Sequence, residues 1–384
     1  MKLQIEQIGA LAIVDRDDWQ QLDSAGNPFL QYDFLNGLEE YGCLDGHGWQ
    51  PCHLLVRSGQ QLLAALPLYL RDNSYGEFVF DWAWAEAYQR NGGHYYPKLV
   101  SAIPFTPVCG PRLLVRRDAA QPETLRRLLL EAMQKLVQET GVSSWHCLFT
   151  GEADQAGLGD SDLLLRKTIQ YHWHNQGFDT FDHFLDSLTS KRRKQIRRER
   201  QQVAQQQVRI ECRNGREISE QQWEIFYTFY CDTFHKRWGS PRLTLDFFKG
   251  LSDSMPEQTL LIMAKQGQDY VAGAFAMLDQ HTLYGRHWGC GRELDKLHFE
   301  LCYYQTIEYC IANGLGRMDA GVQGEHKINR GFQPVTAISG HLIRHPGFRQ
   351  AIGDFLQAEG AETDRYVAAL EAHSPYKQRQ DCKT

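Results

Sequence analysis

The sequence predicts a mixed α/β fold built from two halves. In each half, strands of an antiparallel meander precede a long amphipathic helix, and two more strands follow it. A long helix between strands is typical of a crossover connection, so each half should form a mixed sheet with helices on its faces. A length of 384 residues suits two domains, and 42% hydrophobic with 23% charged residues is typical of globular chains. We expect the domains to span residues 1–176 and 177–384.

The first half is predicted as follows: a helix over 29–42, a hairpin of 50–57 with 61–70, a short strand over 77–82, extended chain over 95–108 and 110–115, a helix over 123–140, and strands over 143–149 and 163–173. The helix over 123–140 has the strongest pattern. Leu125, Leu129 and Leu136 recur at helical spacing, and Gly141 provides its stop signal.

The second half is predicted to repeat that order: helices over 181–206 and 221–237, a meander of strands over 259–265, 270–278 and 281–289, a helix over 297–313, strands over 317–322 and 336–344, and one or two helices within 346–372. Leu301, Tyr304 and Ile307 mark one face of the helix over 297–313, and Gly314 follows its end.

The charge is unevenly distributed. Net charge is −6, yet residues 191–200 hold seven basic residues and one acidic residue, so the rest of the chain carries −12. The candidate anion-binding residues are Lys191, Arg192, Arg193, Lys194, Arg197 and Arg198. Such a helix could bind tRNA, a lipid-linked pyrophosphate or an anionic membrane surface, or it could simply be solvated.

Several classes of protein are excluded by what the sequence lacks. There is no P-loop, no G-x-G-x-x-G, no H-E-x-x-H and no G-x-S-x-G motif. The ten cysteines form no C-x-x-C pair, so we expect reduced thiols and no metal. The first residues show no secretion signal, and no apolar run is long enough to cross a bilayer, so we expect a cytoplasmic protein.

An aromatic segment in the first half is the first candidate site. Residues 74–84 combine aromatic and acidic side chains, and further aromatic residues follow over 95–98. Aromatic faces bind apolar or sugar-like groups, and a charged residue could fix their orientation. The candidate substrate-binding residues are Asp81, Trp82, Trp84, Tyr95, Tyr96 and Lys98. The alternative is an aromatic core, with Asp81 as the N-cap of a helix over 83–90.

Two polar segments in the second half are further candidates. Residues 284–289 end the meander, and residues 319–332 form a glycine-containing loop dense in charged side chains. Acyl transfer needs a donor for the developing oxyanion and a base for the acceptor amine. The catalytic candidates are His287, Glu300, His326 and Lys327, with His298 as another possible base, and the substrate-binding candidates are Arg286, Gln323, Glu325 and Arg330. For each histidine alone the alternative is a buried, hydrogen-bonded core residue.

Ordered strings along nearly the whole chain carry a family resemblance. They include Tyr32-Asp33-Phe34-Leu35, Ser74-Tyr75-Gly76-Glu77, Val79-Phe80-Asp81-Trp82-Ala83-Trp84, Pro104-Phe105-Thr106-Pro107, Leu297-His298-Phe299-Glu300, Gly324-Glu325-His326-Lys327 and His373-Ser374-Pro375. With these strings the sequence resembles the bacterial peptidoglycan biosynthesis/recognition N-acyltransferases, which are related to the Fem-type aminoacyltransferases of the GNAT superfamily.

The resemblance implies a tandem GNAT-like fold and transfer of an acyl or aminoacyl group to an amine, with a peptidoglycan precursor as the acceptor. It also implies that the sheet parts near residues 284–289, where backbone N–H groups polarise an acyl carbonyl, and that Lys327 and Gly331 lie near the substrate. The donor would be acyl-CoA or aminoacyl-tRNA; the [RQ]-x-x-G-x-[GA] loop that grips coenzyme A is missing over 289–294. Two alternatives stay open: a non-catalytic binder of cell-wall fragments or anionic lipid, and acyl-CoA-dependent acetylation of a small-molecule or protein amine. The oligomeric state stays open as well.

Overall fold

The structure is a computed structural model that describes residues 3–159, 161–236 and 239–377, and the chain divides into two compact units. Unit 1 comprises Met1–Thr168, Arg242–Phe247 and Thr336–Arg365, and unit 2 comprises Ile169–Pro241, Phe248–Val335 and Tyr366–Thr384. This division differs from the expected single boundary at residue 176. The reason is strand pairing: Gly340–Ile343, late in the chain, pair with residues 144–147 of unit 1.

Unit 1 contains these elements: β1 (Leu3–Ile8), α1 (Arg16–Gln20), α2 (Tyr32–Glu40), β2 (Trp49–Pro51), β3 (His53–Ser58), β4 (Gln61–Leu66), β5 (Tyr69–Arg71), α3 (Trp82–Arg90), β6 (Lys98–Ser101), β7 (Leu114–Val115), α4 (Pro122–Thr140), β8 (Ser144–Cys147) and α5 (Glu152–Gly159). Four elements have residues in both units: β9 (Leu164–His174), α9 (Leu245–Ser254), β15 (Gln333–Ile343) and α12 (Pro346–Ala372).

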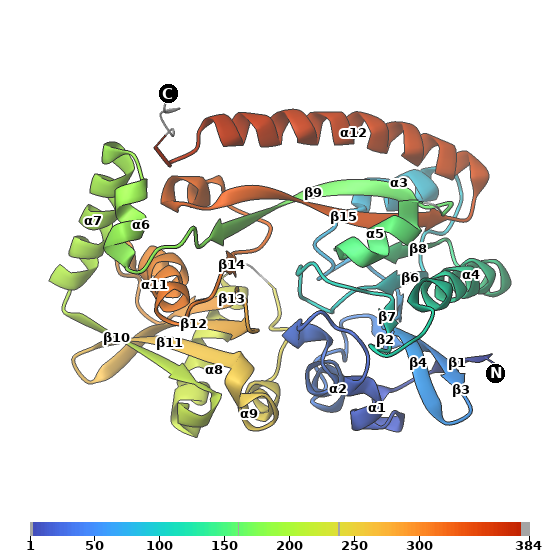
Figure 1. The fold of residues 1–384 in the computed structure, drawn as a ribbon, viewed down its shortest axis with the longest axis horizontal. Coiled ribbons are helices and arrows are strands. Elements are labelled where there is room, and N and C mark those ends of the chain that lie inside the picture. Colours follow the sequence, from blue (N-terminus) through green and yellow to red (C-terminus); the bar gives the residue numbers. More distant parts are fainter. Residues whose placement is uncertain (1–2, 160, 237–238, 378–384) are drawn as a thin grey trace. The chain divides into compact units, whose positions relative to one another are not determined.

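The strands of unit 1 form two sets. One is the antiparallel order β1-β3-β4-β7, and the other is β15-β8-β6-β5-β2, in which only β6 and β8 are parallel. Helix α4 is the crossover between that parallel pair (Figure 1). Pro122 begins it, one residue before the predicted start, and Gly141, with φ of 70°, follows its end, as the sequence predicted. Its apolar face, with Leu125, Leu129 and Met133, packs in the core of this unit.

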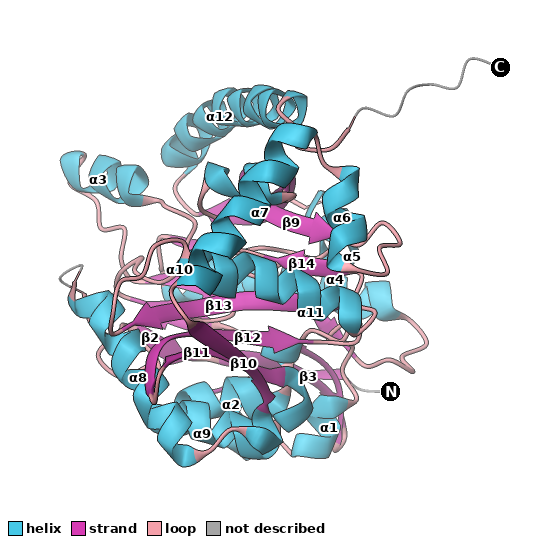
Figure 2. Ribbon diagram, turned by 90° about the vertical axis from the view of Figure 1, so that its left-hand side faces the viewer, coloured by secondary structure: helices cyan, strands magenta, loops and turns pink. Residues whose placement is uncertain are grey.

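Unit 2 contains α6 (Phe181–Ser187), α7 (Ser190–Gln205), β10 (Val208–Asn214), α8 (Glu220–His235), β11 (Thr259–Gln266), β12 (Asp269–Leu278), β13 (Thr282–Cys290), α10 (Leu297–Phe299), the π-helical turn η5 (Glu300–Tyr304), α11 (Gln305–Ala312), β14 (Arg317–Asp319) and the 3-10 helix η6 (Glu325–Arg330). The predicted meander is confirmed: β11, β12 and β13 are consecutive antiparallel strands (Figure 2). The predicted crossover is confirmed too, because α10, η5 and α11 connect β13 to the parallel strand β14.

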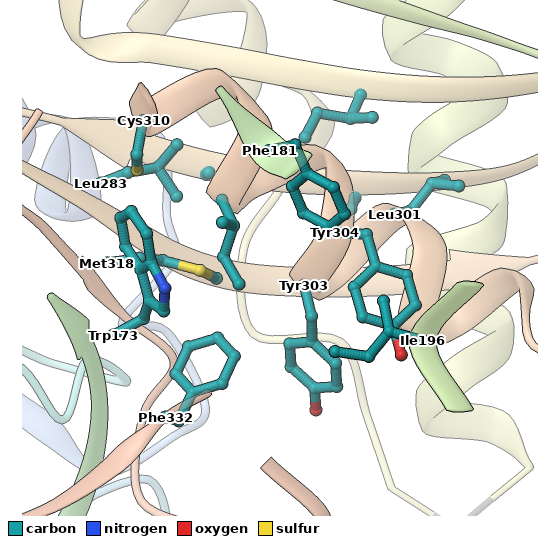
Figure 3. Close-up of a cluster of buried hydrophobic side chains, with 14 of the residues drawn as sticks. Trp173, Phe181, Ile196, Leu283, Leu301, Tyr303, Tyr304, Cys310, Met318 and Phe332 are labelled. Carbon is teal, nitrogen blue, oxygen red and sulfur yellow. The ribbon is translucent and has the colours of Figure 1, made fainter. Parts of the chain in front are cut away.

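Both faces of the meander are covered, because its residues alternate between two cores. Ala272, Ala274 and Ala276 of β12 face a cluster that includes Tyr304, Leu301 and Ile196, part of which is drawn in Figure 3. Between them, Phe275 meets the aromatic rings of α8 and α9 on the other side. This two-residue period is what a sheet between two helical layers requires.

Three predictions about local structure are wrong. Residues 77–81 form no strand, because their charged side chains turn inward to buried cations, and Trp82 instead begins α3. The helix over 181–206 is two helices. Leu188 is extended, with ψ of 156°, and bridges to Tyr376, which separates α6 from α7. The extended chain over 95–108 pairs only in β6.

Six of the elements named above were not predicted: β1, α1, α5, α9, β10 and η6. The predicted helix over 221–237 is α8, but its last expected residue, Arg237, lies outside the described residues. Residues 346–372 form the single helix α12. In the part of the chain that the structure describes, we find no helix with the length and hydropathy needed to cross a bilayer.

Candidate active site

A pocket of about 470 Å³ opens in unit 2 beside β13. Its walls come from β11, β12 and β13, from the helical residues 298–306, and from the chain over 318–327. The predicted residues that line it are Arg286, His287, His298, Gln323, His326 and Lys327. The structure therefore brings the two polar segments of the second half together at one cavity.

The pocket forms where two parallel strands part. Thr282–Tyr284 of β13 pair with Arg317–Asp319 of β14, and in the described residues this pairing goes no further. β13 continues along β12 alone, and a register shift leaves Arg286 as the extra residue of a bulge between partners Gly285 and His287. A bulge bends the strand and redirects its side chain. The residues of β13 beyond Tyr284 therefore line the space that opens between β13 and β14.

Lys327 is a buried cation at the wall of this pocket. It is only 5% exposed, and its Nζ lies 5.5 Å from the centre of the Tyr171 ring. In the part of the chain described, Nζ donates one hydrogen bond, to the carbonyl of Ala320. Burial lowers the pKa of Lys327 to about 8, although the nearby Asp319 carboxylate acts in the opposite direction. An ammonium group has three donors, so two remain for a ligand.

Asp319, at the end of β14, is the carboxylate whose charge acts on Lys327. It is buried, accepts a hydrogen bond from the backbone N–H of Gly321 at 2.8 Å, and lies 3.5 Å from His172 Nε2. Burial acts to raise its pKa, but His172 and the Gly321 bond hold the pKa below the usual value. Asp319 is therefore ionised and offsets part of the charge of Lys327.

Tyr303 and His326 form a hydrogen-bonded pair in the same pocket. The Tyr303 hydroxyl lies 3.0 Å from Nε2 of His326, and its ring packs 5.4 Å from Phe332 within the core cluster (Figure 3). Burial raises the pKa of Tyr303. Burial, Arg330 and Lys327 lower the pKa of His326, which is neutral at pH 7. The proton therefore belongs to the tyrosine, which donates to an imidazole that can accept it.

The remaining polar residues give the pocket a positive potential. Burial lowers the pKa of Arg286 to about 10, partly offset by Asp319, so the guanidinium stays charged. Burial and nearby cations lower the pKa of His298 to about 4, and burial and Arg286 hold that of His287 far below 6.5. None of the described residues that line the pocket is acidic. Such a cavity favours an anion or a developing oxyanion.

Three of the catalytic and substrate-binding candidates in the second half of the chain lie outside the pocket lining. Glu300 is buried and accepts from Arg200 of α7 at 3.0 and 3.1 Å. Arg330 is buried in a two-pronged ion pair with Glu199 at 2.9 and 3.0 Å, and it also donates to the backbone carbonyl of His326. Glu325 is exposed and accepts from the Tyr366 hydroxyl. In the structure Arg330 anchors η6, which presents His326 and Lys327 to the pocket.

The basic segment forms the surface of α7. Ile196, Glu199 and Val203 make its buried face. Among the predicted anion-binding residues, Arg193 and Arg197 pair with Asp186 and Asp182 of α6, at 2.9 and 3.1 Å, and Arg192 donates to Gln195. Lys191, Lys194 and Arg198 are exposed. These three positions, at spacings of three and four, share one side of the helix.

The predicted aromatic segment lies in unit 1, and the structure divides its residues. Asp81 and Lys98 are buried partners at 2.5 Å, and Tyr95 donates to Asp81 at 2.6 Å. Asp81 occupies the N-cap position of α3 but makes no capping bond, because its carboxylate turns to Lys98. Trp84 is buried against α12, Trp82 is exposed and Tyr96 is half-buried.

Sequence reasoning missed Tyr303, Asp319 and His172. Tyr303 falls on an apolar helical face, where its spacing indicates a core residue. His172 lies on β9, more than a hundred residues from Asp319 in sequence. The only available signal was the polar end of β14, since Asp319 begins the charged loop that drew attention to Lys327.

The comparisons agree with this fold. The structure of FemX is 10% identical and matches 91% of this chain and 100% of its own, with a TM-score of 0.53. L-PGS from Bacillus licheniformis is 12% identical and matches 86% of this chain and 97% of its own, with a TM-score of 0.51. These likenesses confirm the expected mixed α/β fold. No curated protein matches the sequence.

The resemblance stated from the sequence strings is also confirmed. The family model described as peptidoglycan biosynthesis/recognition matches residues 10–378, which is nearly the whole chain. The chain belongs to this FemAB-like family.

Proposed function

We propose that the chain is an N-acyltransferase that moves an acyl or aminoacyl group to an amine in the pocket of unit 2. The observation that carries this proposal is Lys327: a buried ammonium with two uncommitted donors at the point where β13 and β14 part. Acyl transfer develops negative charge on the carbonyl oxygen, and a fixed, buried cation beside that oxygen stabilises the charge. Arg286, on the bulge of β13, adds to the same field.

The Tyr303–His326 pair supplies the proton transfer that the reaction needs. An acceptor amine must lose a proton as its C–N bond to the acyl carbon forms. In our proposal the Tyr303 oxygen takes that proton while its own passes to Nε2 of His326, across the 3.0 Å bond. The bond from the acyl carbon to its carrier then breaks, and the proton returns to the leaving oxygen or sulfur. His287 lies between aromatic rings and has the less suitable pKa.

The acceptor and donor follow from the family and from the charge of α7. The family model points to a peptidoglycan precursor as the carrier of the acceptor amine. The donor in our proposal is an aminoacyl-tRNA or an acyl-CoA, each of which is polyanionic. Lys191, Lys194 and Arg198 are exposed, and α7 has cations but no acid in its first turn. Cations at a helix N-terminus are unfavourable by about 0.3–1 kcal/mol each, which a bound anion would offset.

The test combines ligand binding with turnover. The purified protein is incubated with coenzyme A species, total aminoacyl-tRNA and muropeptide precursors, and both thermal stabilisation and product formation are measured. We expect Lys327→Met and His326→Asn to abolish product formation while the exposed control Lys236→Met retains it. Stabilisation by a cell-wall fragment without product from any donor would favour the alternative of a non-catalytic binder of cell-wall fragments. Unchanged turnover in both pocket variants would reject the site.

A further inference from the structure

The segment 74–82 of unit 1 exposes aromatic side chains and buries charged ones. Tyr75, Phe80 and Trp82 are 61%, 54% and 39% exposed, whereas Glu77 and Asp81 are buried. Soluble proteins normally place aromatic side chains inside and charged ones outside, so buried charge and grouped exposed aromatics are the informative exceptions. Here both exceptions occur within nine residues.

Two buried cations, Lys98 and Arg71, bind the polar groups of this segment on its inner side. Lys98 uses all three of its donors, on Ser74 at 2.6 Å, Glu77 at 2.7 Å and Asp81 at 2.5 Å. Arg71 donates to Glu77 at 3.1 Å and to the carbonyl of Tyr75 at 2.8 Å. Burying such a network adds little net stability compared with an apolar core, and its clear effect is to fix one conformation. The aromatic side chains are therefore presented on a rigid loop.

One of these exposed rings, Trp82, borders a pocket with polar walls. Trp82 and Tyr75 lie with ring centres 4.8 Å apart, and Trp82 and Tyr96 line a cavity of about 580 Å³. The other walls of this cavity include Glu86 and Gln89 of α3 and His94. The site thus combines exposed aromatic faces with planar side chains that donate and accept hydrogen bonds.

This combination matches the chemistry of a sugar ring. A pyranose in the glucose configuration has a flat C–H face that packs on an aromatic ring, and its equatorial hydroxyl groups require donors and acceptors at the rim. An acyl chain would gain nothing from Glu86, Gln89 and His94 and would leave them desolvated without partners. The polar rim therefore favours a saccharide over a lipid.

We propose that the Trp82 pocket of unit 1 is a saccharide-binding site, with Trp82, backed by the Tyr75 ring, as its stacking platform and Glu86, Gln89 and His94 as its hydrogen-bonding rim. This site goes beyond the acyl transfer proposed for unit 2, and its existence does not depend on that activity. Lys98 and Asp81 position the platform and do not touch the ligand.

The experiment measures binding of two β-1,4-linked trimers, of glucose and of N-acetylglucosamine, to the full chain by ligand-observed NMR titration. We expect at least one trimer to bind, and Trp82→Ala to weaken it about tenfold or more. The matched control is Phe355→Ala, which removes another exposed aromatic side chain, on α12 and outside the pocket lining. Because Trp82 is exposed, its removal should leave the melting temperature nearly unchanged.

A conservative variant and a lipid arm distinguish the alternatives. Trp82→Phe keeps an aromatic face and should retain most of the affinity, whereas Gln89→Leu should weaken binding by removing a rim donor. Absence of binding to both trimers, or equal affinity in Trp82→Ala, would overturn the proposal. So would Trp82-dependent sedimentation with vesicles of phosphatidylcholine and phosphatidylglycerol in a protein that binds neither trimer. None of these readouts requires transferase activity, so the site in unit 2 can fail independently.

Discussion

Replacing Lys327 with methionine should stabilise the protein at pH 7 while it removes transfer activity. Burial lowers the pKa of Lys327 from 10.5 to about 8. At 1.36 kcal/mol for each pH unit, this difference corresponds to about 3 kcal/mol of free energy that the folded protein loses by keeping the charge in the pocket. Methionine has a similar length and no charge. Loss of the hydrogen bond to Ala320 offsets about 1 kcal/mol, which leaves a net gain of about 2 kcal/mol.

The pH dependence identifies the cause. Between pH 8 and 10.5 the unfolded chain keeps the proton on Lys327 while the folded protein has lost it, so the stability of the wild type rises with pH by about 3 kcal/mol relative to Lys327→Met. Urea unfolding of both proteins from pH 7 to pH 10 should therefore show the advantage of the variant shrinking and then reversing. Lys236→Met, at an exposed position, should follow the wild type throughout. A gap between wild type and Lys327→Met that stays constant over this range would refute the reasoning.

Three further predictions concern the same unit. The rate of acyl transfer should depend on pH with a bell-shaped profile. The rate falls below pH 6.5, where His326, whose pKa is lowered, becomes protonated, and it falls above about pH 8, where Lys327 loses its charge. A rate that does not change with pH would show that neither His326 nor Lys327 takes part in the mechanism. Arg330→Met should cost about 3–5 kcal/mol in urea unfolding, because Glu199 is left buried without its partner, and adding Glu199→Gln should restore part of it. Gly289→Ala should lower the melting temperature by several degrees, because the added Cβ would lie 2.3 Å from backbone atoms of α8. An unchanged melting temperature would show that β13 and α8 can move apart without loss of stability.

The elements that sequence predicted correctly are those with a strong local period. Helix α4 buries one regular face, and the strands β11 and β12 are apolar runs buried on both faces, so the hydrophobic pattern of each can be read within the element itself. Segment 77–82 shows the limit of this reasoning. Its alternating aromatic side chains are typical of a strand, but the inward pull of Lys98 and Arg71 determines its conformation. Those cations come from β6 and β5, and no local pattern reveals that they meet.

The candidate site was predictable only where a local sequence pattern marked its residues. His326 and Lys327 stood out because an apolar core does not explain a charged, glycine-containing loop after a strand. Tyr303 could not be recognised, because a tyrosine at core spacing in a helix becomes functional only when η6 brings His326 to its hydroxyl. Arg330 looked like Lys327 in the sequence, and only Glu199 of α7 distinguishes the two.

Hydrogen-bond satisfaction separates the buried lysine that fixes the fold, Lys98, from the buried lysine that we assign to chemistry, Lys327. Arg112, fully buried in unit 1, donates to the carbonyls of Leu148, Val108 and Gly110, and Lys98 has a partner for each of its donors. A buried ammonium with all three donors bonded, as in Lys98, has no capacity left for a ligand, and removing it only destabilises the fold. Lys327 is equally buried but keeps two donors at a cavity wall, so part of its desolvation is uncompensated in the absence of a ligand. An anion or oxyanion in the pocket would supply that compensation, and the same deficit explains why its loss should raise stability while the loss of Lys98 or Arg112 should lower it.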